Sequence, residues 1–166
     1  RHPLDRGRLF EVAAGEGVGL AGLAGHGQTE LLRALNRRLS PGWIGRRDPR
    51  VAYVAGDRRL DGVFDLWSIR RNLTLGALPD LTRRGLVDTA AEARVAQDWR
   101  ARIGIRTPDP GLPVLSLSGG NQQKVLFARA LLTRAPVILM DDPMRGVDVG
   151  TKHEVYDIIR AEAARG

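Results

Sequence analysis

The 166-residue sequence contains no cysteine, which excludes a disulfide framework and a thiolate metal site and favours a reducing compartment such as the cytosol. No uninterrupted apolar stretch approaches the roughly 20 residues that a membrane-spanning helix needs. The first residues, RHPLDRGR, lack the apolar centre of a secretory signal. Only 5% of the residues are aromatic, and they form no ladder on which bases could stack. These absences predict a soluble, cytosolic protein.

The charge is strongly basic, with a formal net charge of +7. Its arginines are scattered and cluster only as short pairs, at residues 37–38, 46–47 and 83–84. We interpret most of them as solvated surface residues and regard contact with anionic lipid or nucleic acid as the less favoured alternative.

Apolar patterning indicates one α/β domain, because 43% of the residues are apolar and no repeat or low-complexity tract is visible. The stretch GVGLAGLAG, from Gly17, predicts a short buried strand that runs into a glycine-rich turn. TELLRALNRRL then predicts a helix with leucines at helical spacing, and VAYVA, from Val51, predicts a second buried strand.

The character of the chain changes between Asp57 and Pro113, where we expect helices and no strand. One helix is opened by Ser68, and another runs from about Asp88 to Ile103. A further helix follows the turn LSLSGG, and PVILM predicts an apolar strand. After Gly150 a last helix is expected, with a capping box formed by Thr151 and Glu154.

The stretch GLAGHGQTELL has the glycine spacing of a phosphate-binding loop. Gly22, Gly27 and Thr29 match the pattern G-x-x-x-x-G-K-[ST], but Gln28 stands at the position of the lysine. Backbone N–H groups and a helix N-terminus still bind phosphate without that lysine. The lost cation costs about 1.5–3 kcal/mol. By themselves, glycines at such a turn could equally serve close packing, so this motif alone leaves nucleotide binding undecided.

The octet LSGGNQQK, from Leu117 to Lys124, places Ser118, Gly119 and Gly120 at a helix start. Exposed amides, a hydroxyl and the helix dipole attract an anion there. An ordinary N-cap is the alternative for the Ser-Gly-Gly part alone. The full octet resembles the signature motif of the ATP-binding cassette (ABC) ATPases.

PVILMDD resembles the second acidic motif of the same family, in which Asp141 would hold Mg²⁺ and Asp142 would stand at the position of the catalytic base. The family usually has glutamate at that position, and the shorter aspartate implies weak catalysis. The segment from Arg145 to Asp148 corresponds to the D-loop, which meets the partner cassette.

Four stretches, GHGQTELL, YVAGDRRLDGV, LSGGNQQKV and RGVDVGTKHEVYDII, narrow the resemblance to the second, C-terminal cassette of the two-cassette ATPases of bacterial monosaccharide importers. Asp57 and Arg58 match an Asp-Arg pair of that subfamily, whereas Gly56 departs from its acidic residue. The resemblance implies an α/β P-loop NTPase cassette with a mostly parallel sheet and a helical subdomain, truncated at both ends. A core lobe would comprise residues 1–56 and 134–166, and a helical and signature subdomain residues 57–133.

In this family two cassettes pair head to tail, and each ATP lies between the phosphate loop of one and the signature motif of the other. The resemblance therefore implies site residues with four roles. These are ATP binding by Gly22, Gly25, Gly27, Gln28, Thr29 and Glu30; Mg²⁺ binding by Thr29 and Asp141; catalysis by Asp142, Ser118, Gly119 and Gly120; and contact with the partner cassette by Asp148, Asn121 and Gln122.

The resemblance implies ATP and Mg²⁺ as cofactors and sugar import as the function. The implied partners are a first cassette, permease subunits and, indirectly, a sugar-binding protein, with no nucleic acid. The implied location is the cytoplasmic face of the plasma membrane. Two alternatives stay open: a nucleotide-binding regulatory module without turnover, which Gln28 and Asp142 favour, and an ABC-type ATPase that takes no part in transport.

Overall fold

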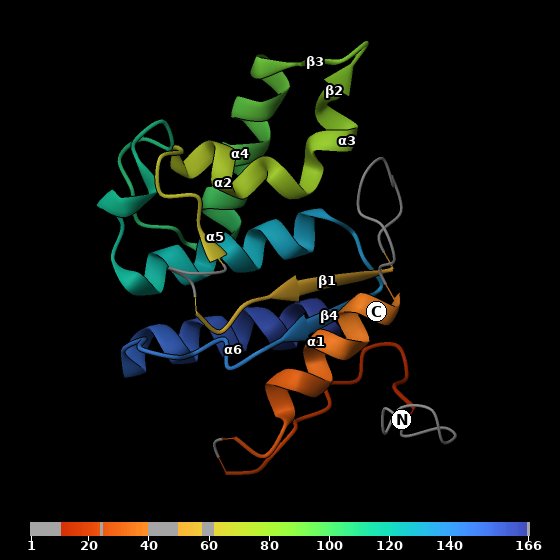
Figure 1. Ribbon diagram of the computed structural model, residues 1–166. Coiled ribbons are helices and arrows are strands. Elements are labelled where there is room, and N and C mark those ends of the chain that lie inside the picture. The colour runs from red at the N-terminus through yellow and green to blue at the C-terminus, as the bar shows by residue number, and fades with distance from the viewer. Residues whose placement is uncertain (1–10, 24, 40–49, 58–61, 166) are drawn as a thin grey trace.

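The centre of the computed structural model, which describes residues 11–23, 25–39, 50–57 and 62–165, is a parallel pair of strands. Strand β1 (Val51–Val54) pairs with β4 (Val137–Met140) in the register Val51 to Val137 through Val54 to Met140 (Figure 1). The strands predicted at VAYVA and PVILM are confirmed. The parallel pairing brings their carboxyl ends to one edge, so that residues near 56 and 141 become neighbours.

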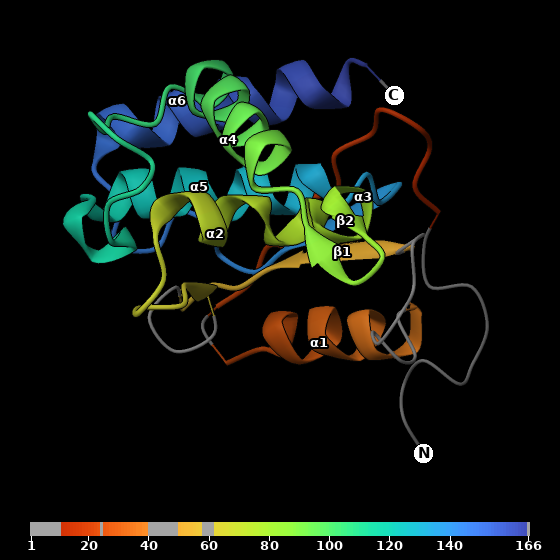
Figure 2. The same ribbon diagram turned by 90° about the horizontal axis from the view of Figure 1, so that it is seen from above.

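Two helices cover the strand pair on opposite faces (Figure 2). On one face lies α1 (Gln28–Leu39), which buries Leu32 and Ala34. On the other face lies α5 (Gly119–Leu132), and α6 (Val149–Ala163) packs beyond it. Among the described residues, none of the helices is both long and apolar enough to cross a bilayer.

The segment between the strands is helical, as the sequence predicts. It contains α2 (Ile69–Thr74), the 3₁₀-helix η3 (Leu75–Ala77), α3 (Leu78–Leu81), α4 (Thr89–Ile103) and a second 3₁₀-helix, η4 (Val114–Ser116). The side chain of Ser68 accepts a hydrogen bond from the Arg71 N–H and begins α2, and Asp88 caps α4 in the same way through the Ala91 N–H.

The expectation of no strand in this segment is wrong, because β2 (Thr82–Arg83) and β3 (Leu86–Val87) form a small antiparallel hairpin. Arg84 and Gly85 join the strands with positive φ angles of 51° and 81°. A two-residue turn of this kind matches the twist of paired strands. Strands of two residues are too short to show an alternating pattern in the sequence.

The strand predicted from Gly17 is also wrong. Residues 17–23 form no strand in the structure and are exposed, with Val18 at 47% and Leu20 at 40%. Three glycines between residues 17 and 22 contribute no side chain to a core. In the described part of the chain, β1 pairs with β4 alone, and residues 17–23 pair with neither strand.

The predicted capping box of the last helix is wrong as well, because α6 begins earlier than expected. Asp148 is its N-cap and accepts hydrogen bonds from the N–H and the hydroxyl of Thr151 at 2.9 and 2.7 Å. Thr151 is therefore the third residue of the helix, and Glu154 is free to pair with other side chains.

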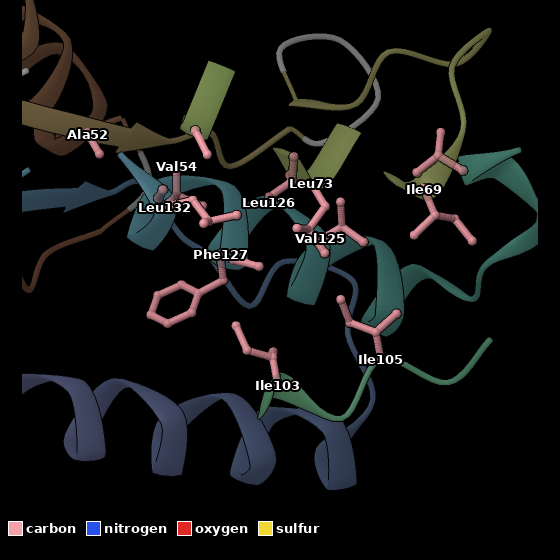
Figure 3. Close-up of a cluster of buried hydrophobic side chains, with 14 of the residues drawn as sticks. Ala52, Val54, Ile69, Leu73, Ile103, Ile105, Val125, Leu126, Phe127 and Leu132 are labelled. Carbon is pink, nitrogen blue, oxygen red and sulfur yellow. The ribbon is translucent and has the colours of Figure 1, made fainter. Parts of the chain in front are cut away.

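The hydrophobic core is built around α5. Figure 3 shows Val125, Leu126 and Phe127 of this helix among side chains from β1, α2 and the end of α4. Arg129 lies in the same region and donates hydrogen bonds to the carbonyl oxygens of Asn72 and Gly62, each at 2.8 Å. Burial lowers the pKa of Arg129 to about 10, so the guanidinium stays charged at neutral pH and joins α5 to α2.

Candidate functional site

The glycine-rich loop takes a conformation that needs glycine. Gly25 and Gly27 have φ angles of 85° and 96°, which side chains rarely adopt. A Cβ atom at either position would meet nothing within 4 Å, so close packing does not explain these glycines. The Leu31 N–H already bonds to the Gly27 carbonyl at 2.9 Å, and the loop thus leads directly into α1. The amides ahead of that bond, at the positive end of the helix dipole, can bind an anion.

Gln28 turns its side chain back across the loop. Its Nε2 donates to the carbonyl oxygen of Leu23 at 3.3 Å. The same Nε2 would lie 2.3 Å from a Cβ atom on Gly22, so a side chain at position 22 would displace this amide. The residue at the usual lysine position is therefore a neutral donor held against the loop, while Glu30 in the first turn of α1 is exposed.

A cluster of oxygens lies beside the loop, at the carboxyl ends of the strands. The Thr29 hydroxyl donates to Asp141 Oδ1 at 2.8 Å across 112 residues of sequence. Asp141 is 8% exposed, and its N–H bonds to the Val54 carbonyl at 3.0 Å, which extends the pairing of β1 with β4. The structure thus brings together the two residues that the sequence assigns to a metal.

These two residues fit Mg²⁺. The ion prefers carboxylate and hydroxyl oxygens in octahedral geometry, where adjacent ligands lie about 2.9 Å apart. The separation of 2.8 Å between the Thr29 and Asp141 oxygens is close to this value. The described residues offer no group of three or more His, Asp or Glu side chains that could hold a metal, so phosphate and water would complete the coordination.

Sequence reasoning missed Tyr53. This residue of β1 donates its hydroxyl hydrogen bond to the second carboxylate oxygen of Asp141, Oδ2, at 2.9 Å. Burial and this hydrogen bond raise the pKa of Tyr53 above its ordinary value, whereas a hydrogen bond with Arg33 acts in the opposite direction. The only sequence signal was a tyrosine inside an otherwise aliphatic strand.

Asp142 follows Asp141 in an exposed turn and has a φ angle of 38°. Its carbonyl accepts from the Arg145 N–H at 3.1 Å, which closes the turn. In the bend that follows β1, a Cβ atom on Gly56 would lie 2.7 Å from the Asp141 carbonyl oxygen. The backbone of Asp141 therefore leaves no room for an acidic side chain at position 56, where the resemblance to the subfamily implies one. Arg58 lies outside the described residues.

The signature segment forms a second cluster, at the start of α5. Ser118 is the N-cap, and its Oγ accepts from the N–H of Asn121 at 3.4 Å and from the side-chain amide of Asn121 at 2.9 Å. The Arg106 N–H holds the other end of that amide by donating to Asn121 Oδ1 at 2.8 Å. Since a hydroxyl accepts about two hydrogen bonds and donates one, the exposed O–H of Ser118 remains available to donate outward.

The next residues of the segment pack against α6. Gly119 is half-buried and Gly120 is buried. A Cβ atom on Gly120 would lie 2.7 Å from Cγ2 and 2.8 Å from Oγ1 of Thr151, which Asp148 holds in place. Asp148 is exposed, and the hydrogen bonds from Thr151 lower its pKa. Gln122, predicted at an interface, is 8% exposed and donates to the Leu117 carbonyl at 3.0 Å.

Lys124, a buried residue of α5, connects this cluster to neighbouring elements. It is 3% exposed, donates to the Gly104 carbonyl at 2.9 Å and forms an ion pair with Glu154 of α6. Glu154 also binds Arg106 at 2.9 Å, and the hydrogen bond from Lys124 lowers its pKa. An open hollow of about 810 Å³ beside these residues, between α4, α5 and α6, is separate from the glycine-rich loop. The contacts of Glu154 with Lys124 and Arg106 join α5 and the segment before it to α6.

Comparison with known proteins identifies the family of the chain. The family model described as ABC transporter matches residues 7–145. A ribose import ATP-binding protein of Rhizobium etli is 37% identical over 177 residues, covering 96% of this chain and 35% of the relative. A xylose import ATP-binding protein of Burkholderia ambifaria is 39% identical over 173 residues, covering 95% and 33%. The chain thus spans about a third of the length of these relatives.

Among solved structures, the fold is similar to a dimeric ATP-binding cassette in a post-hydrolysis state with ADP and phosphate. The TM-score is 0.74 at 21% identity, covering 93% of this chain and 72% of the other. This likeness confirms the predicted α/β fold with a parallel sheet. Because the family model covers most of the sequence and the relatives align along nearly all of it, the chain belongs to the ABC transporter family of ATP-binding cassettes.

Proposed function

We propose that this chain is the ATP-binding subunit, or a part of one, of an ABC importer for a monosaccharide. The observation that carries the proposal is the hydrogen bond between Thr29 and Asp141, 112 residues apart, beside a loop whose glycines adopt positive φ. The ribose and xylose import proteins among the relatives support the substrate class. ATP hydrolysis would then be coupled to uptake of the sugar.

In its own site, the chain would bind ATP weakly. Backbone amides from Gly22 to Glu30 would bind the phosphates, and Thr29 and Asp141 would hold Mg²⁺, which neutralises phosphate charge when bound. Asp142 would stand at the position of the base for the attacking water. Gln28 supplies no cation, and a missing charge-assisted contact of about 1.5–3 kcal/mol corresponds to roughly ten- to a hundredfold in affinity.

Across the interface with a partner cassette, the signature cluster would make the larger catalytic contribution. Ser118 has a free O–H, and the amides of Gly119 and Gly120 lie at the positive end of α5. These donors suit the γ-phosphate of an ATP molecule that the partner binds, where negative charge is stabilised during attack by water. Asn121 and Asp148, which lie at the starts of α5 and α6, would contact the partner, with Gln122 supporting them from within.

The chain would work as one part of a larger transporter assembly. Residues 1–56 and 134–166 would form the core lobe, and residues 57–133 the helical lobe that leans on the permease subunits. Pairing with a first cassette would complete two ATP sites, and a sugar-binding protein would act through the permease. The chain would therefore work at the cytoplasmic face of the plasma membrane.

Titration with a fluorescent ATP analogue and Mg²⁺ tests nucleotide binding. We expect micromolar binding by the wild type and about tenfold tighter binding by Gln28→Lys, because the new ammonium would restore the phosphate contact. Gln97→Lys is the matched control, since it adds the same charge on the exposed face of α4. Absence of binding by both the wild type and Gln28→Lys would contradict the proposed site.

A regulatory module that binds nucleotide without turnover is the second candidate. It is favoured by the neutral side chain of Gln28 in the loop and by the exposed, turn-bound position of Asp142. Steady-state phosphate release separates the two candidates. Release that depends on Asp142 and is lost in Asp142→Asn supports the ATPase, whereas tight binding with no release supports the module.

A further inference from the structure

We infer that Tyr53 is a positioning residue for the metal site: its hydroxyl fixes the carboxylate of Asp141 so that one oxygen faces Thr29. The inference rests on the proposed function, because it concerns the same MgATP site. Three elements meet here, since Thr29 is the second residue of α1, Tyr53 lies in β1 and Asp141 follows β4.

The two oxygens of Asp141 have different partners. Oδ1 accepts from the Thr29 hydroxyl at 2.8 Å, and Oδ2 accepts from the Tyr53 hydroxyl at 2.9 Å. A carboxylate held at one oxygen only can rotate about its Cβ–Cγ bond. With the phenol on Oδ2, rotation would break a hydrogen bond, so Oδ1 stays turned toward the position where a metal would bind.

The phenol of Tyr53 has a second hydrogen-bond partner besides Asp141. Arg33, one turn after Thr29 on α1, forms a hydrogen bond with the Tyr53 side chain. The same face of α1 thus supplies a metal ligand and a residue that orients the phenol. The chain of contacts from Arg33 through Tyr53 to Asp141 has the form of outer-shell support, in which hydrogen-bond partners of a metal ligand fix its direction.

Support of this kind affects the metal more than the nucleotide. Loss of an outer-shell hydrogen bond typically weakens metal affinity about 10- to 100-fold. Tyr53→Phe removes one oxygen atom and keeps the ring, so β1 and its packing should persist. The variant would bind nucleotide normally without a divalent ion and lose the additional affinity that Mg²⁺ provides.

The test compares the affinity for a fluorescent ATP analogue in Mg²⁺ with the affinity in EDTA, for the wild type, Tyr53→Phe and the control Tyr156→Phe. Tyr156 is the other tyrosine of the chain and is 47% exposed on α6. We expect the ratio of the two affinities to fall about tenfold, or to one, in Tyr53→Phe. The ratio should be unchanged in Tyr156→Phe, and binding in EDTA should be equal in all three proteins.

The outcomes separate this inference from the proposed function. A wild-type chain that binds no nucleotide overturns both. Wild-type binding that Mg²⁺ strengthens equally in Tyr53→Phe overturns only the role of Tyr53. A uniform loss of binding in Tyr53→Phe, with and without Mg²⁺, would indicate a merely structural role and would also overturn it.

A second measurement keeps the tyrosine hydroxyl at position 53, in case Tyr53→Phe does not fold. In a Tyr156→Phe background, Tyr53 is the sole tyrosine, and labelling with 3-fluorotyrosine gives one ¹⁹F NMR signal. Adding Mg²⁺ to the ATP-bound chain should shift this signal, because the carboxylate that accepts its hydrogen bond becomes a metal ligand. A signal that does not move on addition of Mg²⁺ would contradict the inference.

Discussion

Replacing Gly120 by alanine would test the packing of the signature segment against α6. The new Cβ atom would lie 2.7 Å from Cγ2, 2.8 Å from Oγ1 and 3.1 Å from Cβ of Thr151. Contacts this short force the two helices apart or move Thr151, whose hydroxyl is bonded to Asp148 at 2.7 Å. Gly120→Ala should therefore strain the junction between the start of α5 and the start of α6.

The magnitude follows from two opposing effects. Overpacking of a tight site costs about 1–3 kcal/mol. Alanine in place of glycine inside a helix stabilises it by about 0.8–1.0 kcal/mol. The net loss of unfolding free energy should thus lie between about 0 and 2 kcal/mol. In a Thr151→Ala background the two shortest contacts are absent, and Gly120→Ala should become neutral or stabilising by up to about 1 kcal/mol.

Urea denaturation of the wild type, both single variants and the double variant gives the coupling between the two positions. We expect a favourable coupling of about 1–3 kcal/mol, equal to the relieved overpacking. Far-UV circular dichroism of the four proteins checks that each one folds. Additive effects, within about 0.5 kcal/mol, would refute the close approach of Gly120 to Thr151.

Two further substitutions probe the ion pairs and the core. Glu154→Gln should destabilise the chain by about 1–2 kcal/mol at pH 7, a loss between those typical of exposed and of buried ion pairs. The intermediate value is expected because Lys124 is buried, whereas water screens the half-exposed Glu154. The pKa of Glu154 is lower in the folded state, so its contribution is complete above the unfolded value near 4.5 and is lost as the pH falls through the folded value. Urea midpoints of the wild type and variant should therefore converge at acidic pH, and a constant difference would contradict this assignment. Arg129→Met should cost about 3 kcal/mol or more, because the carbonyls of Asn72 and Gly62 lose buried charged donors; thermal and urea unfolding measure it, and an unchanged midpoint would contradict it.

Much of the fold could be predicted from local chemistry. Ser68 and Asp88 are caps that fix helix starts, and the apolar runs at Val51 and Val137 are strands that pair in parallel. The resemblance to the ABC ATPases also implied that Thr29, which follows a glycine-rich turn, and Asp141, which follows an apolar strand, would both hold Mg²⁺. The structure confirms that these two residues lie together.

The missed features depend on contacts between distant segments. Tyr53 resembles any strand tyrosine until β4 places Asp141 beside it. Lys124 belongs to a recognisable motif, but its burial against Glu154 follows only from the position of α6. The capping box failed because Asp148, and not Thr151, is the N-cap of α6. The strand from Gly17 failed because its glycines supply no side chains to pack in a core.

Hydrogen–deuterium exchange of the purified chain, with and without MgATP, tests most directly whether the glycine-rich loop is a nucleotide site. Bound phosphate would occupy the amides of Gly25 and of residues 27–30, so these amides should exchange more slowly with MgATP than with MgAMP, whereas the N–H groups of His26 and Leu31 already bond to backbone carbonyls. The start of α5 should be unchanged, because its donors serve ATP on a partner. Unchanged exchange in the loop at saturating MgATP, or protection confined to other segments, would contradict the account.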